Sequence, residues 1–91
     1  MRLARSTSQF RRSLKKILKS GRYSKNEIQK VVDVLILGKT LDEKYKDHSL
    51  HGELSSERGC HVYPDLIIVY RIENNNLVLV FVDIGSHSDL F

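Results

Sequence analysis

Residues 66–82 read LIIVYRIENNNLVLVFV, and this stretch decides the fold. Its first part is a mostly continuous apolar and β-branched run, which is typical of a strand buried in the middle of a sheet. Three asparagines at positions 74–76 supply turn chemistry. Residues 77–82 then return as an equally apolar strand. The stretch therefore predicts an antiparallel β-hairpin.

Two amphipathic helices are expected upstream of this hairpin. The first begins at Thr7 or Ser8, both favourable N-caps, and runs to about Lys19. The second begins at Ser24 and stops at Gly38. Apolar side chains recur at helical spacing along one face of each predicted helix: Phe10, Leu14, Ile17 and Leu18 in the first, and Ile28, Val31, Val32 and Leu35 in the second.

The remaining segments favour short strands and loops. Residues 2–6 fit a brief edge strand, and residues 39–47 fit a polar loop. A short strand is expected over Glu53–Ser56, and another begins near Cys60 and is interrupted by Pro64, which lacks the N–H of a central ladder. The predicted class is α+β, with two N-terminal helices packed on one face of a small, mainly antiparallel sheet.

Length and charge point to one domain, 1–91, with a polyanionic partner. Residues 1–46 contain 13 lysines and arginines against four acids, a net +9, whereas residues 47–91 contain two against seven, a net −5. A one-sided basic half favours a nucleic acid or an acidic protein, although two solvated lysine-rich helices would give the same count. The single cysteine excludes an internal disulfide, and no signal-peptide or membrane-spanning run is present, so a cytoplasmic protein is expected.

Ionisable side chains are concentrated in residues 48–70, which hold three of the four histidines, the only cysteine and the only proline. Cleavage of RNA through its 2′-hydroxyl requires a base, an acid and a cation or strong donor for the charged phosphorane. Histidine suits the first two roles because its pKa lies near neutral pH, and arginine suits the third. The candidates are His48, His61 and His87 for acid and base, Arg58 for the phosphate, and Asp65 as base or as the group that orients a histidine.

Other interpretations of the same residues remain open. Loop histidines are commonly plain surface residues, Asp65 after a proline can be a turn residue, and Arg58 can pair with a neighbouring glutamate. Zinc is a chemical rival because His48, His51, Cys60 and His61 are close in sequence. Structural zinc sites favour several cysteines, however, and Cys60 and its neighbour would point to opposite faces of a strand.

Several motifs resemble the YafQ group of bacterial toxins, within the RelE/ParE superfamily of type II toxin–antitoxin systems. These are YKDHSLHGEL at 45–54, R-x-x-H-V at 58–62, PDLIIVY at 64–70 and GSH…LF at 85–91. The resemblance implies a ribosome-dependent mRNA endoribonuclease of microbial-ribonuclease-like fold, without a metal or other cofactor. It also implies an acidic antitoxin and the ribosome as partners. The catalytic residues it implies are His48, His61, Asp65 and His87, with Phe91 as the terminal aromatic residue near the RNA.

Two positions depart from similar sequences. Leu66 stands where tryptophan is common, and Asp83 stands where some relatives carry arginine. These departures keep open an RNA- or protein-binding module whose site has decayed. A ParE-like inhibitor of DNA gyrase also stays open, because that branch of the superfamily shares the scaffold.

Overall fold

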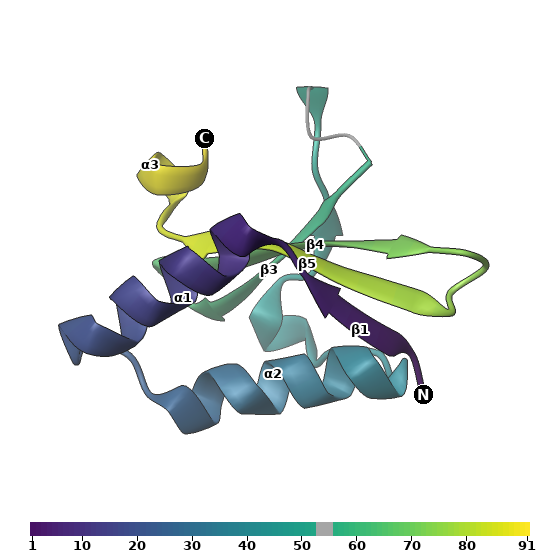
Figure 1. The fold of residues 1–91 in the computed structure, drawn as a ribbon, viewed down its shortest axis with the longest axis horizontal. Coiled ribbons are helices and arrows are strands. Elements are labelled where there is room, and N and C mark those ends of the chain that lie inside the picture. Colours follow the sequence, from purple (N-terminus) through teal and green to yellow (C-terminus); the bar gives the residue numbers. More distant parts are fainter. Residues whose placement is uncertain (53–55) are drawn as a thin grey trace.

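The computed structural model, which describes residues 1–52 and 56–91, places the predicted hairpin at the centre of a five-stranded sheet (Figure 1). The strand order is β1-β5-β4-β3-β2, and only the pair β1–β5 is parallel. The strands are β1 (Leu3–Ser6), β2 (His48–Ser49), β3 (Arg58–Tyr63), β4 (Leu66–Glu73) and β5 (Val78–Gly85). The helices are α1 (Ser8–Ser20), α2 (Lys25–Leu37), the short 3₁₀ helix η1 (Glu43–Tyr45) and α3 (His87–Leu90).

The hairpin prediction is confirmed, together with its turn. β4 and β5 pair from Glu73 opposite Val78 down to Ile67 opposite Gly85. The asparagines at 74, 75 and 76 have φ angles of 50, 55 and 71°. Asparagine adopts this left-handed conformation more readily than most residues, so three in succession suit the turn.

Both helix predictions are also confirmed. The Thr7 side chain accepts a hydrogen bond from the backbone of Phe10 at the start of α1, and Ser24 accepts one from Glu27 at the start of α2. Each helix ends at a glycine in the left-handed conformation. The two helices run in opposite directions, with α2 below the sheet in the view of Figure 1.

The short segments agree with the sequence less well. The edge strand within residues 2–6 is confirmed as β1. Most of the strand expected over 53–56 lies outside the described residues, and Ser56 itself is in a turn. The pairing of β2 with β3, and the helix α3, were not predicted, because two-residue and four-residue elements leave almost no periodicity in a sequence.

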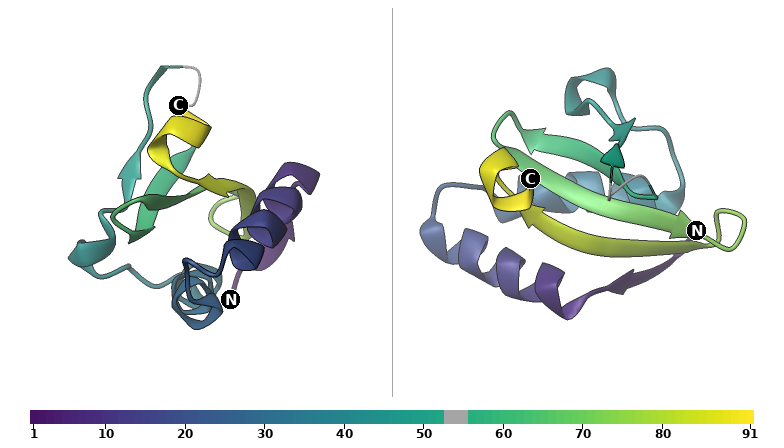
Figure 2. Two further views of the ribbon diagram at one scale, coloured as in Figure 1. Left: turned by 90° about the vertical axis from the view of Figure 1, so that its left-hand side faces the viewer. Right: turned by 90° about the horizontal axis from the view of Figure 1, so that it is seen from above.

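The main core lies between the helices and one face of the sheet (Figure 2). Phe10 of α1 stacks on Phe81 of β5 with ring centroids 5.2 Å apart. Val31 of α2 and Tyr70 of β4 are among the most deeply buried residues of this layer. On the opposite face, Leu50, Ile67 and Val69 form a small apolar cluster, with Val82 and Leu90 packed against it. One face of the sheet therefore stabilises the fold, and the other is open for a site.

Within the described residues, no helix is both long and apolar enough to cross a membrane.

Candidate active site

Strand alternation brings two of the predicted histidines together on the open face of the sheet. In the β2–β3 ladder, His48 lies directly opposite Gly59. His61 is two residues beyond Gly59, so its side chain is on the same face of the sheet as His48. Cys60, which lies between Gly59 and His61, points to the other face and is buried in the main core. The rings of His48 and His61 are close to parallel, with centroids 6.3 Å apart.

Backbone carbonyls select the tautomer of both neutral rings. His48 Nδ1 lies 2.7 Å from the Lys46 carbonyl oxygen, and His61 Nδ1 lies 3.2 Å from the Pro64 carbonyl oxygen. A carbonyl can only accept, so each Nδ1 carries the proton and donates it. In a neutral imidazole the other nitrogen, Nε2, is then an unprotonated acceptor. Both histidines are thus held in the form that can take a proton at Nε2.

Helix α3 supplies the remaining wall of this site. The ring of its first residue, His87, contacts the ring of Phe91, with centroids 4.9 Å apart and planes tilted by 48°. Together with β2, β3 and β4, α3 encloses a cavity of about 170 Å³, here called the histidine cavity. Its lining residues are His48, Ser49, Leu50, His51, His61, Ile67, His87 and Phe91.

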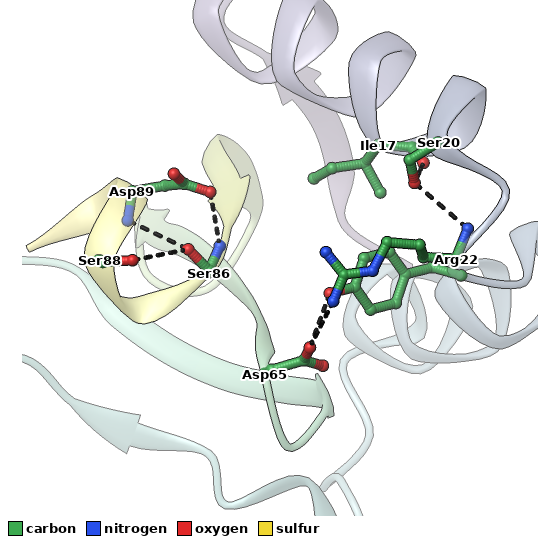
Figure 3. A network of polar contacts seen from close by, with 8 residues as sticks. Ile17, Ser20, Arg22, Asp65, Ser86, Ser88 and Asp89 are labelled. Atoms are coloured by element: carbon green, nitrogen blue, oxygen red, sulfur yellow. Dashed lines mark hydrogen bonds and ion pairs between the residues drawn. The ribbon is translucent and has the colours of Figure 1, made fainter.

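The position of α3 is set by a capping box and a close approach to β5. The Ser86 hydroxyl accepts a hydrogen bond from the Asp89 backbone, and the Asp89 carboxylate accepts one from the Ser86 backbone (Figure 3). The interaction of the Asp89 carboxyl with the Ser86 side chain, and then with the Ser86 backbone N–H, lowers the pKa of Asp89 below its usual value. A Cβ atom at Gly85 would lie 3.1 Å from Asp89 Cβ and 3.6 Å from Leu90. Only glycine therefore lets the short helix sit this close to the end of β5.

Asp65 lies in the turn after β3, but its carboxylate faces the loop between α1 and α2. It accepts a hydrogen bond from the Tyr23 hydroxyl at 2.9 Å and pairs with Arg22 at 3.4 Å (Figure 3). The hydrogen bond to Asp65, followed by partial burial, raises the pKa of Tyr23. Asp65 does not line the histidine cavity. Its turn does include Pro64, whose carbonyl holds His61.

Arg58 lies on the other face of the sheet from His61, because the two are three positions apart along β3 and side chains alternate between the faces. Its guanidinium donates to the Ser49 hydroxyl at 3.0 Å and pairs with Asp47 at 3.3 Å. The second oxygen of Asp47 accepts a hydrogen bond from the buried Tyr70 hydroxyl at 2.5 Å. Burial, and then this bond to Asp47, raise the pKa of Tyr70. The structure thus does not bring Arg58 to the three histidines.

The two departures from similar sequences also lie away from the histidine cavity. Leu66 is 1% exposed and belongs to the main core, so it offers no surface for stacking on a base. Asp83 lines a separate cavity between α1 and α3, together with Lys16 and Asp89. Its carboxylate accepts a hydrogen bond from the Ile84 backbone at 2.8 Å. Neither residue faces the three histidines.

Sequence reasoning missed the groups that orient the histidines. Two of them are backbone carbonyls, of Lys46 and Pro64, which leave no side-chain signal. His51 was considered only as a zinc ligand, yet it lines the histidine cavity. Strand alternation from His48 would place residue 51 on the other face, but β2 ends at Ser49, so no local pattern indicated this position.

Zinc binding is the other chemistry considered for His48, His51, Cys60 and His61. Among residues 1–52 and 56–91, no group of three or more histidine, cysteine, aspartate or glutamate side chains is arranged to hold a metal ion. Cys60 is fully buried, and this burial raises the pKa of its thiol to about 12. A buried thiol with so high a pKa is a poor ligand and a poor nucleophile.

Comparison with known proteins was made on this fold and site. Residues 2–91 match the model of a family described as "Bacterial toxin of type II toxin-antitoxin system, YafQ". This match spans nearly the whole chain. The chain belongs to the YafQ family of bacterial toxins.

Individual members of the family agree with this assignment. The mRNA interferase toxin YafQ of Escherichia coli K12 is 33% identical over 85 residues, which cover 79% of this chain and 90% of the relative. The crystal structure of a metal-bound toxin from Helicobacter pylori has 40% identity and a TM-score of 0.88, with all of both chains covered. The DinJ–YafQ complex of E. coli has 28% identity and a TM-score of 0.87, with 100% of this chain and 99% of the toxin covered.

Proposed function

We propose that this YafQ-family toxin is an mRNA endoribonuclease that cuts transcripts on the ribosome. The observation that carries the proposal is the histidine cavity, which His48, His61 and His87 line together, with Nδ1 of two rings held by backbone carbonyls. The E. coli K12 relative is named an mRNA interferase, which supports the same reaction. Because its substrate is being translated, the toxin acts in the cytoplasm.

The cavity supports attack by the RNA 2′-hydroxyl on the adjacent phosphorus. An Nε2 of the His48–His61 pair takes the hydroxyl proton, and the 2′-oxygen bonds to phosphorus. His87, on the facing wall and protonated at the start, gives a proton to the departing 5′-oxygen. The P–O5′ bond breaks, leaving a 2′,3′-cyclic phosphate and a 5′-hydroxyl. Because both rings have Nδ1 held by a carbonyl, the base is assigned to the pair rather than to one of its members.

Phe91 holds the base of the nucleotide being cut. Its ring is 52% exposed, contacts His87 and lines the cavity. An exposed aromatic ring beside the reacting groups allows a base to stack, and stacking contributes about 1–3 kcal/mol per base. Stacking there would bring the attached ribose to the histidines.

Arg58 and Asp65 act as positioning residues in this proposal. Arg58 of β3 bonds to Asp47 and Ser49, the two residues that flank His48 in the chain. Asp65 anchors the turn whose Pro64 carbonyl holds His61, through its bonds to Arg22 and Tyr23. Each therefore reaches the reaction through a histidine rather than through RNA.

The toxin also has a cognate acidic antitoxin. The relative from E. coli forms a complex with DinJ. In this chain, residues 1–46 carry a net charge of +9, which suits an acidic partner. A purified toxin that fails to bind the acidic product of a neighbouring gene would count against this part of the proposal.

Primer extension on a reporter mRNA in a translating extract tests the reaction. Wild-type protein should produce cuts that require ribosomes, and His87→Ala should lower the cleavage rate by about 10²–10⁴-fold, the usual contribution of a general acid or base. His87 is exposed, so this variant should remain folded. His51→Ala is the matched control, because His51 lines the same cavity without an assigned step.

Growth arrest without cuts would refute the proposal. If that arrest came with altered DNA supercoiling, inhibition of gyrase would replace it. Retained cleavage by folded His87→Ala would instead remove His87 from the mechanism.

A further inference from the structure

A second cavity lies directly beside the histidine cavity, and His61 lines both. This groove, here called the lysine groove, has a volume of about 340 Å³, which falls within the roughly 300–1,000 Å³ range of small-ligand sites. Its lining residues are Glu27, Lys44, Tyr45, Lys46, His61, Val62, Tyr63 and Pro64. A molecule bound in one cavity can therefore extend into the other past His61.

The groove forms where the sheet edge is left uncovered. β2 pairs with β3 only at residues 58 and 59. Beyond them, no strand within the described part of the chain continues the ladder on that side of β3. The helix η1 packs beside this edge instead, and its residues bring Lys44 and Tyr45 next to the end of β3.

The walls combine positive charge with aromatic rings. Lys44 and Lys46 are exposed, and the Lys44 ammonium lies 5.1 Å from the centre of the Tyr45 ring. Tyr63, at the end of β3, contributes a second half-buried ring. The acidic member, Glu27, accepts a hydrogen bond from Lys30 at 3.1 Å, which offsets its charge. Lysines with interleaved aromatic rings are the usual lining of a single-stranded nucleic acid site.

The histidine cavity itself contains no lysine or arginine among the described residues that line it. The phosphates of an RNA chain bound there need cations, and Arg58 faces the other side of the sheet. The lysine groove has two. The Lys46 carbonyl also accepts the hydrogen bond from His48, so the Lys46 side chain begins next to the histidine cavity.

We propose that the lysine groove binds the nucleotide next to the cut in single-stranded RNA. Lys44 and Lys46 contact the phosphates, and the base stacks on Tyr45 or Tyr63. The inference rests on the proposed RNA cleavage and adds a subsite to it. An acidic peptide would suit the lysines equally well, but the continuity with the histidine cavity favours the RNA that is cut there.

The test uses an oligonucleotide that binds without being cut. Primer extension first maps the wild-type cut site. A fluorescent hexaribonucleotide spanning that site, with a 2′-deoxyribose at the cut, is then titrated with wild-type protein over a range of salt concentrations. Each phosphate contact contributes about 0.7 to the slope of log affinity against log salt for a single strand.

The double variant Lys44→Ala/Lys46→Ala should lower that slope by about 1.4 and weaken binding on the order of tenfold near physiological salt. Lys15→Ala/Lys19→Ala is the control, because these exposed lysines of α1 do not line the groove. An abasic ribose next to the cut should weaken wild-type binding about 5- to 150-fold if the base stacks on a tyrosine.

Several results would overturn the inference. These are an unchanged slope in the groove variant, an equal fall in the control, or no oligonucleotide binding by wild-type protein. Loss of antitoxin binding with intact oligonucleotide binding would reassign the groove to the antitoxin. The proposed cleavage stands or falls separately, on whether the wild-type protein cuts the reporter mRNA at all.

Discussion

Replacing Arg58 with glutamine should slow RNA cleavage without weakening RNA binding. Arg58 faces away from the histidine cavity, and its guanidinium joins Asp47 and Ser49 to β3. His48 lies between these two residues in a strand of only two residues. The backbone ladder of β2 is therefore short, and the side-chain contacts of Arg58 supply much of what holds it in place.

The structure sets the expected size of the effect. The Arg58–Asp47 pair is partly exposed, with side-chain accessibilities of 39% and 26%, so solvent screens it and it contributes about 1 kcal/mol or less. The hydrogen bond to Ser49 adds about 1 kcal/mol. Folding stability should thus fall by about 1–2 kcal/mol. Cleavage should fall by more, on the order of 10²-fold, if His48 moves by about 1 Å.

Three measurements check this prediction. They are the cleavage rate in a translating extract, the salt dependence of binding to the uncleavable hexaribonucleotide, and unfolding in urea. Arg71→Gln is the matched control, because Arg71 of β4 also bridges two acids, Glu57 and Glu73. It should lose similar stability and keep near-normal cleavage. Asp47→Asn should resemble Arg58→Gln, and the double variant should be little worse than either, since both break one network.

Two outcomes would refute this reasoning. A fall of about 0.7 in the salt slope for Arg58→Gln would mean that Arg58 contacts a phosphate. Equal losses of cleavage in Arg58→Gln and Arg71→Gln would mean that lost stability, rather than the position of His48, is responsible.

Three further changes have definite expectations. Gly85→Ala should displace α3 by a few tenths of an ångström, because the new Cβ meets Asp89 at 3.1 Å. This should destabilise the fold by about 1 kcal/mol and slow cleavage several-fold. Unchanged cleavage alongside a normal urea midpoint would contradict this prediction. Tyr23→Phe removes the hydrogen bond to Asp65, so the cleavage rate should fall while the free energy of unfolding in urea changes by about 1 kcal/mol or less. An unaltered cleavage rate would show that this bond does not position the turn. Burial raises the pKa of Cys60 in the folded protein to about 12 from about 9, so its contribution to stability is complete below about pH 9 and is lost as pH rises toward 12. Urea unfolding near pH 8 and near pH 10.5 should show about 2 kcal/mol more alkaline loss for wild type than for Cys60→Ala, and equal losses would contradict it.

The sequence predicted the parts of the fold that repeat. The helices around Phe10 and Val31 and the hairpin through Tyr70 each turn several apolar residues toward the core at a regular spacing, and all three were confirmed. β2 and α3 are too short to show any spacing. They exist because other elements hold them, as Gly85 and Ser86 hold α3.

The residues of the candidate site were predicted from their chemistry, and the structure separates them into those that line the cavity and those that do not. His48, His61 and His87 were chosen because they can exchange protons, and the structure places them around one cavity. Arg58 and Asp65 were chosen by the same chemistry but are directed elsewhere. Alternation decides the face for Arg58, but the strand was expected to begin only near Cys60, so the rule did not reach residue 58. The contact of Asp65 with the helical loop joins residues 42 and 43 positions apart, and no local pattern reports such a contact.

The division of each strand between a helix-covered face and an open face has a consequence for how this toxin can diversify. In β3, Cys60 packs in the core and His61 lines the cavity, so the two neighbouring positions have different physical requirements. Substitutions on the open face can alter which transcripts are cut while the core remains intact. A single-residue insertion or deletion within the strand would exchange the two sets of side chains and disable both. Lineages should therefore diverge in β3 through point changes, and tolerated length differences should fall in the connecting loops.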